Sequence, residues 1–466
     1  MPRRAEPVLT AAQMRAAEQE LIAGGTSVDA LMLRAGQGAA DYVWRMSGGR
    51  AVTVLCGPGN NGGDGYVIAE AIRLRGGDVA VVAAADPATD AARSARAAYG
   101  GQVLGPSETR RGDVFVDCLF GTGLALALSE DHVALLGRLA ASHDLRITID
   151  LPSGVETDTG RMSNGDLPRF DLTVALGAWK PAHFLMPAAP TMGALRLVDI
   201  GVLPPSGCAT RLLRPALQRP DAADHKYTRG LLGVVAGGMP GAALLAARAA
   251  QHAGAGYVKL LGEGSTIAPA DLVVDAAPLA DVLGDERFSA LLVGPGLGRG
   301  AVAIERLVQA LARQSPTVVD ADALMLLAPR LLEERVAPMI LTPHEGEMGA
   351  LERAFGLPAG QDKVERTLAL AARVKAVVVA KGADTLIASP EGRLVFSPPA
   401  SSWLSTAGTG DVLAGTIASR LAAGAEPFEA ACQGLWLHGE AARFAGAAFT
   451  AGQLAECVQA AYAACL

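Results

Sequence analysis

The segment "STAGTGDVLAGTIA", residues 405–418, places an aspartate in a glycine-rich turn that leads directly into an apolar pattern typical of a helix. Such a turn, here Gly408, Thr409 and Gly410, directs backbone N–H groups and the positive end of the helix dipole toward one point, which suits an anion. Asp411 would repel a phosphate, but it can accept the proton of a hydroxyl group that attacks phosphorus. The segment therefore predicts an anion-binding turn beside a base, although a capping aspartate would explain the turn taken alone.

The first half of the chain holds a second group of polar residues beside glycine-rich turns. The segment "CGPGNNGGDGYVIAE" (56–70) comes after a predicted strand and opens a helix, as a turn that contacts phosphate through its backbone must do. Asp117 in "DCLFGTGL" and Asp150 in "IDLPSGVETDTG" end two further predicted strands. A lone aspartate at a strand end usually caps the next element of the chain, but two of them beside two such turns indicate a site.

Short runs rich in Val and Ile, which we expect to be strands, must position the polar residues of both halves of the chain. Each run is followed by glycine and a helical pattern, as in "AVTVLCGPG" and "RITIDLPSG" in the first half and "ALLVGPGLG" and "AVVVAKGADTLIA" in the second. This rhythm is typical of parallel strands buried on both faces, whose carboxyl ends collect ligands. Because residues 206–221 are rich in Pro, Gly and Arg, we expect a linker there between two α/β domains, a Rossmann-like three-layer α/β/α domain over 1–205 and a second over 222–466.

Composition limits the class of protein. A chain of 466 residues with net charge -7 does not indicate a nucleic-acid or membrane-surface partner, so we expect small-molecule partners. No apolar run of about 18 residues and no signal peptide is evident, which predicts a cytoplasmic location. The six cysteines have no CxxC spacing, so neither a zinc site nor a disulfide framework is expected.

The second half resembles a known family across residues 222–466. Polar or glycine-rich segments follow five of its predicted strands: Gly237 and Gly238, "GPGLG" (294–298), "DADAL" (320–324), His344 with Glu345, and "KGADT" (381–385). In this order, and together with "STAGTGDVLAG", they resemble the ribokinase-like superfamily and most of all its ADP- or ATP-dependent NAD(P)H-hydrate dehydratases. The resemblance implies a ribokinase-like α/β fold for this domain.

The same resemblance implies roles by position. Asp411 is then the catalytic base and Gly408, Thr409 and Gly410 form the anion hole. The nucleotide side is lined by Lys381, Gly382, Ala383, Asp384 and Thr385, and the hydrated dinucleotide is contacted by Ala242, Gly296 and His344. The family phosphorylates the 6-hydroxyl of the hydrated nicotinamide ring and then loses phosphate, with ADP or ATP as donor and Mg²⁺.

Taken singly, some of these residues have plainer explanations. His344 could be a loop histidine, and Lys381 could be a solvated lysine at a strand end. Asp320 and Asp322 could bind Mg²⁺ with the nucleotide or cap the next helix.

Residues 8–204 resemble the NAD(P)H-hydrate epimerase family through the three segments of the first half and the helix "MRAAEQELIAGG". By that resemblance Asp150 acts as acid or base on the reacting ring, and Asn61, Asp117 and Ser153 surround a potassium ion. The dinucleotide is held by Asn60, Asn61, Gly62, Gly63, Asp64, Gly121, Thr122, Gly123, Leu124, Ala125, Leu126 and Ala127. Two segments depart from the family pattern, "LALAL" (124–128) and "WKPAHFLMPAAP", which contains Lys180.

The two resemblances predict one bifunctional enzyme, because a dehydratase that accepts only the S form of NADHX or NADPHX needs an epimerase to supply the R form. We expect a homo-oligomer. The alternative enzyme is a ribokinase-like kinase for a vitamin-type alcohol such as hydroxymethylpyrimidine. A second alternative makes the first half a binding module without catalysis.

Overall fold

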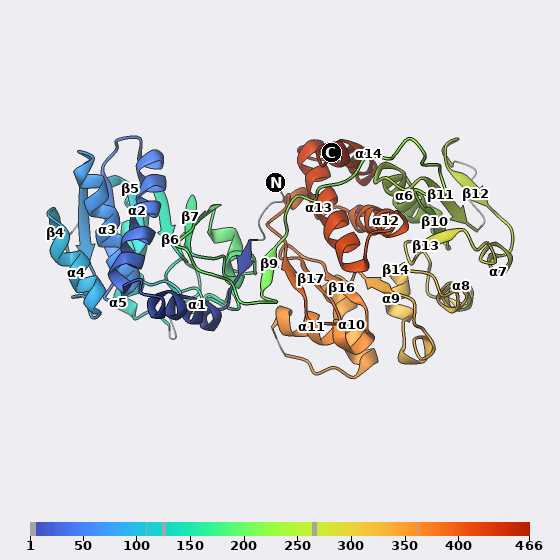
Figure 1. Ribbon diagram of the computed structural model, residues 1–466, viewed down its shortest axis with the longest axis horizontal. Helices are drawn as coiled ribbons and strands as arrows, with labels where there is room; N and C mark the ends of the chain where they lie inside the picture. The colour runs from blue at the N-terminus through green and yellow to red at the C-terminus, as the bar shows by residue number, and fades with distance from the viewer. Residues whose placement is uncertain (1–5, 109, 124–126, 263–267, 361) are drawn as a thin grey trace. The chain divides into compact units, whose positions relative to one another are not determined.

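A computed structural model describes residues 6–108, 110–123, 127–262, 268–360 and 362–466. The chain divides into two compact units, Met1–Arg211 (unit 1) and Leu212–Leu466 (unit 2). Each unit is a largely parallel sheet with helices packed against it (Figure 1). The prediction of two tandem α/β domains is therefore confirmed. In the described part of the chain, no helix is long and apolar enough to cross a membrane.

Unit 1 is built on a seven-stranded parallel sheet ordered β4-β3-β2-β5-β6-β7-β8. The strand order reverses between β2 and β5, and ligands bind at such a point in doubly wound sheets. The strands are β2 (Val52–Cys56), β3 (Val79–Ala83), β4 (Gln102–Leu104), β5 (Gly112–Cys118), β6 (His143–Ile149), β7 (Leu172–Leu176) and β8 (Ala194–Val198).

Helices cover both faces of this sheet, which is why its strands are apolar without alternation. The helices are α1 (Ala11–Ala23), α2 (Val28–Ser47), α3 (Asn60–Leu74), α4 (Asp90–Ala98) and α5 (Glu130–Ala141). Val52, Val54 and Cys56 of β2 belong to the core that α2 and α3 complete. Leu55, on the opposite face, joins the core formed with Leu136 and Leu139 of α5.

Unit 2 has a mixed sheet in which β18-β17-β16-β15-β14-β13-β10-β11-β12 follow one another. The strands are β10 (Leu231–Val235), β11 (Tyr257–Leu261), β12 (Val273–Asp275), β13 (Phe288–Val293), β14 (Thr317–Val319), β15 (Met339–Leu341), β16 (Val377–Ala380), β17 (Leu386–Ala388) and β18 (Leu394–Phe396). The run from β16 to β12 is parallel, and β17 and β18 add an antiparallel edge. The carboxyl ends of β10 and β13 to β16 therefore share one edge.

The helices of unit 2 place one buried helix, α12, against this sheet. They are α6 (Pro240–His252), α7 (Leu279–Val282), α8 (Ala301–Ala312), α9 (Asp322–Leu326), α10 (Glu345–Phe355), α11 (Lys363–Val374), α12 (Thr409–Ala422), α13 (Pro427–Ala445) and α14 (Ala451–Ala463). Helix α12 packs between α6, α13 and the sheet, with α8, α10 and α11 on the other face (Figure 1). A Cβ on Gly415 would lie 2.0 Å from the Ala246 carbonyl oxygen, so small residues set the spacing of α12 and α6.

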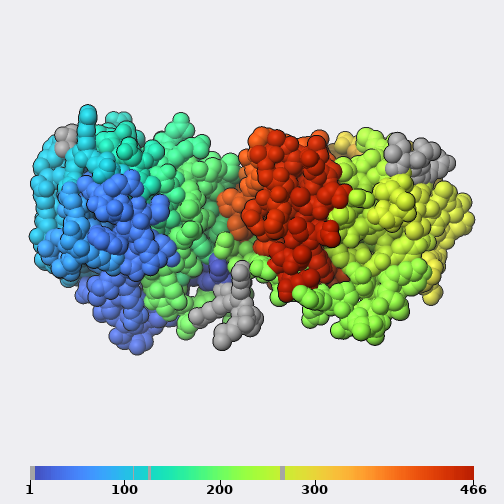
Figure 2. Space-filling view, turned by 90° about the horizontal axis from the view of Figure 1, so that it is seen from above, coloured from blue at the N-terminus to red at the C-terminus, as the bar shows by residue number. Residues whose placement is uncertain are grey.

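Distant segments meet on the surface of unit 2. The C-terminal helices, red in Figure 2, lie beside yellow-green segments from the start of the unit, and α14 contacts α6. In unit 1 a short antiparallel pair joins β1 (Pro7–Val8) to β9 (Ala209–Arg211), which lies inside the segment 206–221 expected to be a linker.

Candidate active sites

The shared carboxyl edge of the unit 2 sheet gathers the polar residues singled out in the second half. Asp320 follows β14, His344 lies three residues beyond β15, and Lys381 directly follows β16. The first turn of α12 brings Asp411 to the same place, because a Cβ on the neighbouring Gly410 would lie 3.6 Å from Lys381 Nζ.

The turn before α12 is fixed by its own hydrogen bonds. Gly408 adopts a left-handed conformation, φ 90°, and among the described residues no side chain caps the helix. Thr409 Oγ1 donates to the Leu404 carbonyl oxygen at 2.7 Å. His438 Nε2 donates to the Thr409 carbonyl at 2.9 Å, and burial lowers the pKa of His438 to about 4, so this imidazole is neutral. Thr409 N–H donates to the Thr406 carbonyl at 3.3 Å and Val412 N–H to the Gly408 carbonyl at 3.2 Å. Within the described residues this leaves Gly410 N–H and Asp411 N–H as the donors of this turn that an anion could reach.

Asp411 lies in an acidic surrounding that contains one close cation. Lys381 Nζ is 2.8 Å from Asp320 Oδ1 and 3.8 Å from Glu347 Oε2. Burial raises the pKa of Asp411 to about 7, with Asp320 raising it further and Lys381 opposing the shift. A carboxyl with this pKa exchanges a proton near neutral pH, as a general base must.

Residues 381–385 form a compact turn held from α11. Thr385 Oγ1 accepts from Gly382 N–H at 3.1 Å and donates to the Gly382 carbonyl at 2.8 Å. Lys363 Nζ, at the start of α11, donates to the Asp384 carbonyl at 2.9 Å and also contacts the Asp384 carboxylate. Ala383 lies within this turn and is exposed.

Two predicted substrate residues, Ala242 and Gly296, are brought together. Gly296 has φ 62°, and a Cβ there would lie 2.1 Å from the Met239 carbonyl and 3.1 Å from Ala242 Cβ. His344 instead caps α10, since its Nδ1 accepts from Gly346 N–H at 3.0 Å. Its Nε2 lies 3.3 Å from Glu347 Oε1, and its side chain is 59% exposed.

In unit 1, the turn after β2 lies at the point where the strand order reverses. Asn60, Asn61, Gly62, Gly63 and Asp64 form the first turn of α3. A Cβ on Gly62 would lie 1.9 Å from the Gly57 carbonyl oxygen, so only glycine fits. Asn60 Oδ1 accepts from Thr89 Oγ1 at 2.7 Å, and Asp64 is buried.

Asp117, at the end of β5, is fully buried and bound to Ser153. Its Oδ1 accepts from Ser153 Oγ at 2.8 Å and its Oδ2 from Ser153 N–H at 2.9 Å. Burial raises the pKa of Asp117 to about 6, although these hydrogen bonds oppose the shift. The side-chain nitrogen of Asn61 is buried and has no hydrogen-bond partner within the described residues.

Asp150, at the end of β6, joins the glycine turns of unit 1. Its Oδ2 accepts from Thr122 N–H at 3.2 Å, and a Cβ on Gly121 would be 3.2 Å from both this oxygen and Asn61 Oδ1. Its Oδ1 contacts Lys180 Nζ in a buried ion pair. Gly123 and Ala127 are exposed, whereas Leu124, Ala125 and Leu126 lie outside the described residues.

Comparisons with known proteins decide the family. The family model "NAD(P)H-hydrate dehydratase" matches residues 232–462, and the model "YjeF-related protein N-terminus" matches residues 28–182. The chain is 36% identical over 455 residues to the bifunctional NAD(P)H-hydrate repair enzyme Nnr of Mycobacterium leprae, which covers 94% of this chain and 93% of that relative. The chain belongs to the bifunctional NAD(P)H-hydrate repair enzymes. The recognition made from sequence motifs is confirmed.

The chain is also similar to a second bifunctional NAD(P)H-hydrate repair enzyme and to a solved structure. The Nnr enzyme of Gloeobacter violaceus is 36% identical, with 94% of each chain covered. A solved ADP/ATP-dependent NAD(P)H-hydrate dehydratase from Bacillus subtilis, co-crystallized with ATP/Mg²⁺, is 29% identical with a TM-score of 0.48, covering 54% of this chain and 95% of its own.

The donor atoms at the two sites differ in their fit to the metal ions expected for a bifunctional NAD(P)H-hydrate repair enzyme. No group of three or more His, Cys, Asp or Glu side chains able to hold a metal ion occurs among the described residues. Asp320 is engaged by Lys381 and, at 2.6 Å, by Thr342 Oγ1. Asp322 accepts from Gly298 N–H at 3.0 Å, and no side chain caps α9. Neither aspartate therefore caps the helix, and Mg²⁺ there would need phosphate oxygens as additional ligands.

Oxygen atoms dominate the predicted potassium site. The Asp117 carboxylate, Ser153 Oγ and the Phe120 carbonyl, which accepts from Ser153 Oγ at 3.1 Å, lie together. These are the hard donors that suit a weakly held monovalent cation. Asn61 lies in the first turn of α3, and its Oδ1 is 3.2 Å from the position of a Cβ on Gly121, the residue after Phe120.

Several site residues were missed from the sequence. Lys363 gives no signal, because it is an ordinary first residue of a helix that lies 18 or more positions before the turn it supports. Glu347 could have been found, since His344 and Glu347 have the spacing of a capping box, and Glu347 Oε2 accepts from His344 N–H at 2.8 Å.

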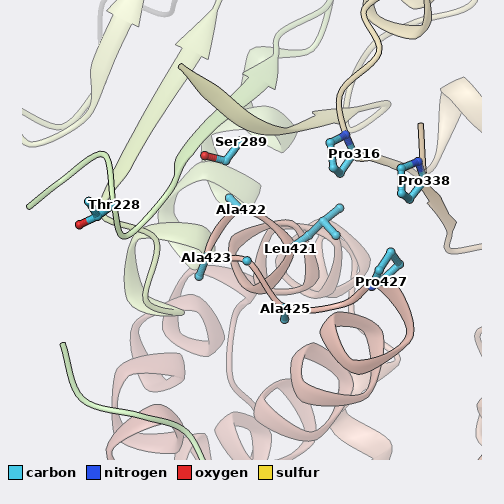
Figure 3. A pocket seen from close by; sticks show the side chains of 10 residues that line it. Thr228, Ser289, Pro316, Pro338, Leu421, Ala422, Ala423, Ala425 and Pro427 are labelled. Atoms are coloured by element: carbon cyan, nitrogen blue, oxygen red, sulfur yellow. The ribbon is translucent and has the colours of Figure 1, made fainter. Parts of the chain in front are cut away.

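A cavity of about 360 Å³ in unit 2 is separate from these residues (Figure 3). Thr228, Pro316 and Pro338, which line it, precede β10, β14 and β15 and therefore lie at the amino ends of these strands. The remaining lining comes from Ser289, from the end of α12, from the loop that follows it and from the first residue of α13. The cavity lies at the opposite edge of the sheet from Asp411.

Proposed function

We propose that this chain repairs hydrated nicotinamide nucleotides with two activities. Unit 2 dehydrates the S form of NADHX or NADPHX with ADP or ATP, and unit 1 interconverts the R and S forms. The corresponding domains are residues 1–205 and 222–466, joined by 206–221. The observation that carries the proposal is Asp411 in the first turn of α12, beside Lys381 and an uncapped helix N-terminus. Membership of the bifunctional repair enzymes supports both activities.

The dehydratase step begins with proton transfer. Asp411 accepts the proton of the C6 hydroxyl, whose oxygen attacks the terminal phosphorus while the bond to the leaving nucleotide breaks. With ADP, the leaving nucleotide is AMP. The N–H groups of the α12 turn and Lys381 stabilise the charge of the phosphoryl group in transfer. The C6–O bond then breaks, phosphate departs and the ring loses a proton, which restores the dihydropyridine.

The nucleotide is proposed to lie against residues 381–385, because this turn is held by Lys363 and begins with the cation Lys381. Mg²⁺ is proposed to enter on the nucleotide phosphates and to neutralise their charge. Ala242, Gly296 and His344 are proposed to contact the hydrated dinucleotide.

In unit 1, Asp150 is proposed to act as acid or base on the nicotinamide ring, and residues 60–64 and 121–127 to hold the dinucleotide. K⁺ is proposed to bind through Asn61, Asp117 and Ser153. Replacing K⁺ by the larger organic cation tetramethylammonium is then expected to slow epimerisation and leave dehydration of the S form unchanged.

The experiment that tests both activities uses purified chain, an R and S mixture of NADHX, Mg²⁺, K⁺ and either ADP or ATP. Complete recovery of absorbance at 340 nm, faster than spontaneous epimerisation, supports the proposal and names the donor. A halt after the S fraction favours a binding module in unit 1, and no recovery contradicts the repair function.

Phosphate release separates the proposal from the vitamin-type kinase. A repair enzyme releases inorganic phosphate in step with NADH, whereas a kinase retains the phosphoryl group in a stable product. Sedimentation of the same preparation tests the proposed homo-oligomer.

A further inference from the structure

The segment Lys180–His183 folds back onto Asp150, and we call Lys180 and His183 the Asp150 clamp. Lys180 Nζ contacts Asp150 Oδ1 and donates to the Leu176 carbonyl at 2.6 Å. The Lys180 and Asp150 side chains are 1% and 6% exposed, respectively. A buried ion pair of this kind stabilises little by itself, but removal of one partner leaves an uncompensated charge.

His183 holds the backbone of the same aspartate. Its Nδ1 accepts from Lys180 N–H at 2.9 Å, which leaves the proton on Nε2. Nε2 therefore donates to the Asp150 carbonyl at 2.8 Å. Burial lowers the pKa of His183 to about 4, so the ring is neutral and this donor persists at neutral pH.

Lys180 of the clamp and the turn that contains Gly121 and Thr122 contact different carboxylate oxygens of Asp150. Oδ1 is held by Lys180 and by Leu176 N–H at 3.3 Å, whereas Oδ2 faces Gly121 and Thr122. Asp150 itself has φ 68°, a left-handed conformation that a residue with a side chain adopts at a cost. The backbone bond from His183 opposes relaxation of this conformation.

Two further carboxyl groups, those of Asp64 and Glu18, interact electrostatically with Asp150 and Lys180. Burial raises the pKa of both Asp64 and Glu18, and the charge of Asp150 raises them further. Burial raises the pKa of Asp150, but Lys180, His183 and the Leu176 N–H together lower it below its ordinary value, with Lys180 contributing most of the lowering. Without Lys180, Asp150 would be a buried carboxylate facing two other acids.

We propose that Lys180 and His183 are positioning residues for epimerisation, which fix Asp150 with Oδ2 directed at the substrate turn 121–123. This inference rests on the proposed epimerase activity of unit 1. Lys180 and His183 are buried and contact Asp150, so both are proposed to act through the placement of Asp150. A displacement of about 1 Å at a reacting group can cost about 100-fold in rate.

The test compares two substitutions of one residue in the full chain. His183→Leu removes both ring nitrogens, whereas His183→Gln can donate from near the Nε2 position. We expect His183→Leu to lower kcat for epimerisation of R-NADHX about 100-fold with KM within about twofold, and His183→Gln to recover most of the rate. Lys180→Met is expected to lower kcat at least as much, and Lys180→Arg to restore part of it.

Dehydration of S-NADHX by the same preparations is the internal control, since it depends on unit 2. If His183→Leu disturbs the circular dichroism of the chain, His183→Asn replaces it, because Asn keeps an acceptor for Lys180 N–H and loses the donor to Asp150. Equal rates for the Leu, Asn and Gln variants, or a change in KM alone, would overturn the inference. Absence of epimerisation in the unchanged chain would instead contradict the proposed function.

Discussion

At the residue scale, the chemistry proposed for unit 2 depends on an aspartate whose ionised form is disfavoured by its surroundings. Asp411 is partly buried and near Asp320 and Glu347, with Lys381 as the nearby cation. The same surroundings that raise its pKa make it a stronger base when ionised. Activity and stability therefore respond to its charge in opposite directions.

Asp411→Asn is expected to lower dehydration of S-NADHX by about 1,000-fold, because the amide cannot accept the hydroxyl proton. Epimerisation in unit 1 should be unchanged. The measurement is NADH recovery from S-NADHX, with epimerisation of R-NADHX followed separately by chromatography. An Asn variant with more than a tenth of the original rate would exclude Asp411 as the base.

The pH dependence follows from the raised pKa of Asp411. Dehydration should fall about tenfold per pH unit below about 7, because the base is then protonated. The folded-state pKa of Asp411, about 7, is higher than its unfolded-state pKa, near 4. The stability that this carboxyl contributes is therefore fully present below about pH 4 and is lost as the pH rises through about 7. Asp411→Asn should therefore melt at least as high as the unchanged chain at pH 8, and a lower melting temperature would contradict this sign.

The sequence predicted three residues of the proposed sites, and missed some of the residues that hold them in place. Asp411, Asp150 and Lys381 each adjoin a turn that marks them. Lys363 and His183 contact these turns from segments whose local pattern carries no such mark. Pairing of this kind depends on tertiary packing, which a single sequence does not display.

At the element scale, α12 connects the site to the core. Its residues from Val412 to Ala422 are buried, and Gly408 at its start has φ 90° with Ala451 and Leu245 close by. A Cβ on Gly408 would lie 2.9 Å from Ala451 Cβ and 3.0 Å from Leu245 Cδ1. The turn proposed to bind the anion is thus closely packed against α6 and α14.

Gly408→Ala is expected to move this turn and lower kcat/KM for the nucleotide about 100-fold. Gly424→Ala is the matched control, since Gly424 has φ 88° just after α12 but open space where its Cβ would lie. Each substitution should cost about 1–2 kcal/mol of unfolding free energy through its backbone conformation. Equal activity in the two variants would show that the turn tolerates displacement.

The strands and the glycine turns were predictable from sequence because buried parallel strands are apolar without alternation. The antiparallel strands β17 and β18 and the short pair of β1 and β9 were not separately expected. Two- and three-residue strands carry too little pattern to be recognised.

At the scale of the whole molecule, two units with separate cores carry the two proposed activities. The S form made in unit 1 can reach unit 2 through solution if no direct transfer is required. The order of the units along the chain was predictable from the change in composition near residue 206. The two hydrophobic cores could also be predicted, because apolar strands occur both before and after residue 206.

Mixing Asp150→Asn chain with Asp411→Asn chain is therefore expected to restore complete NADH recovery from an R and S mixture. Each variant alone should stop, the first after the S fraction and the second at the start. The measurement is the final absorbance at 340 nm against the rate of spontaneous epimerisation. A mixture that stalls at the S fraction would show that the two active units must belong to one chain.

The left-handed backbone of Asp150 also limits which substitutions this position can accept over time. Only glycine, asparagine, aspartate and histidine adopt φ near 68° readily, and of these only aspartate carries a carboxylate. Glutamate would supply the charge but would strain the backbone and carry the charge one methylene too far. A related chain that kept the proposed activity could not exchange Asp150 for glutamate. The backbone conformation and the chemistry together therefore restrict this position to aspartate.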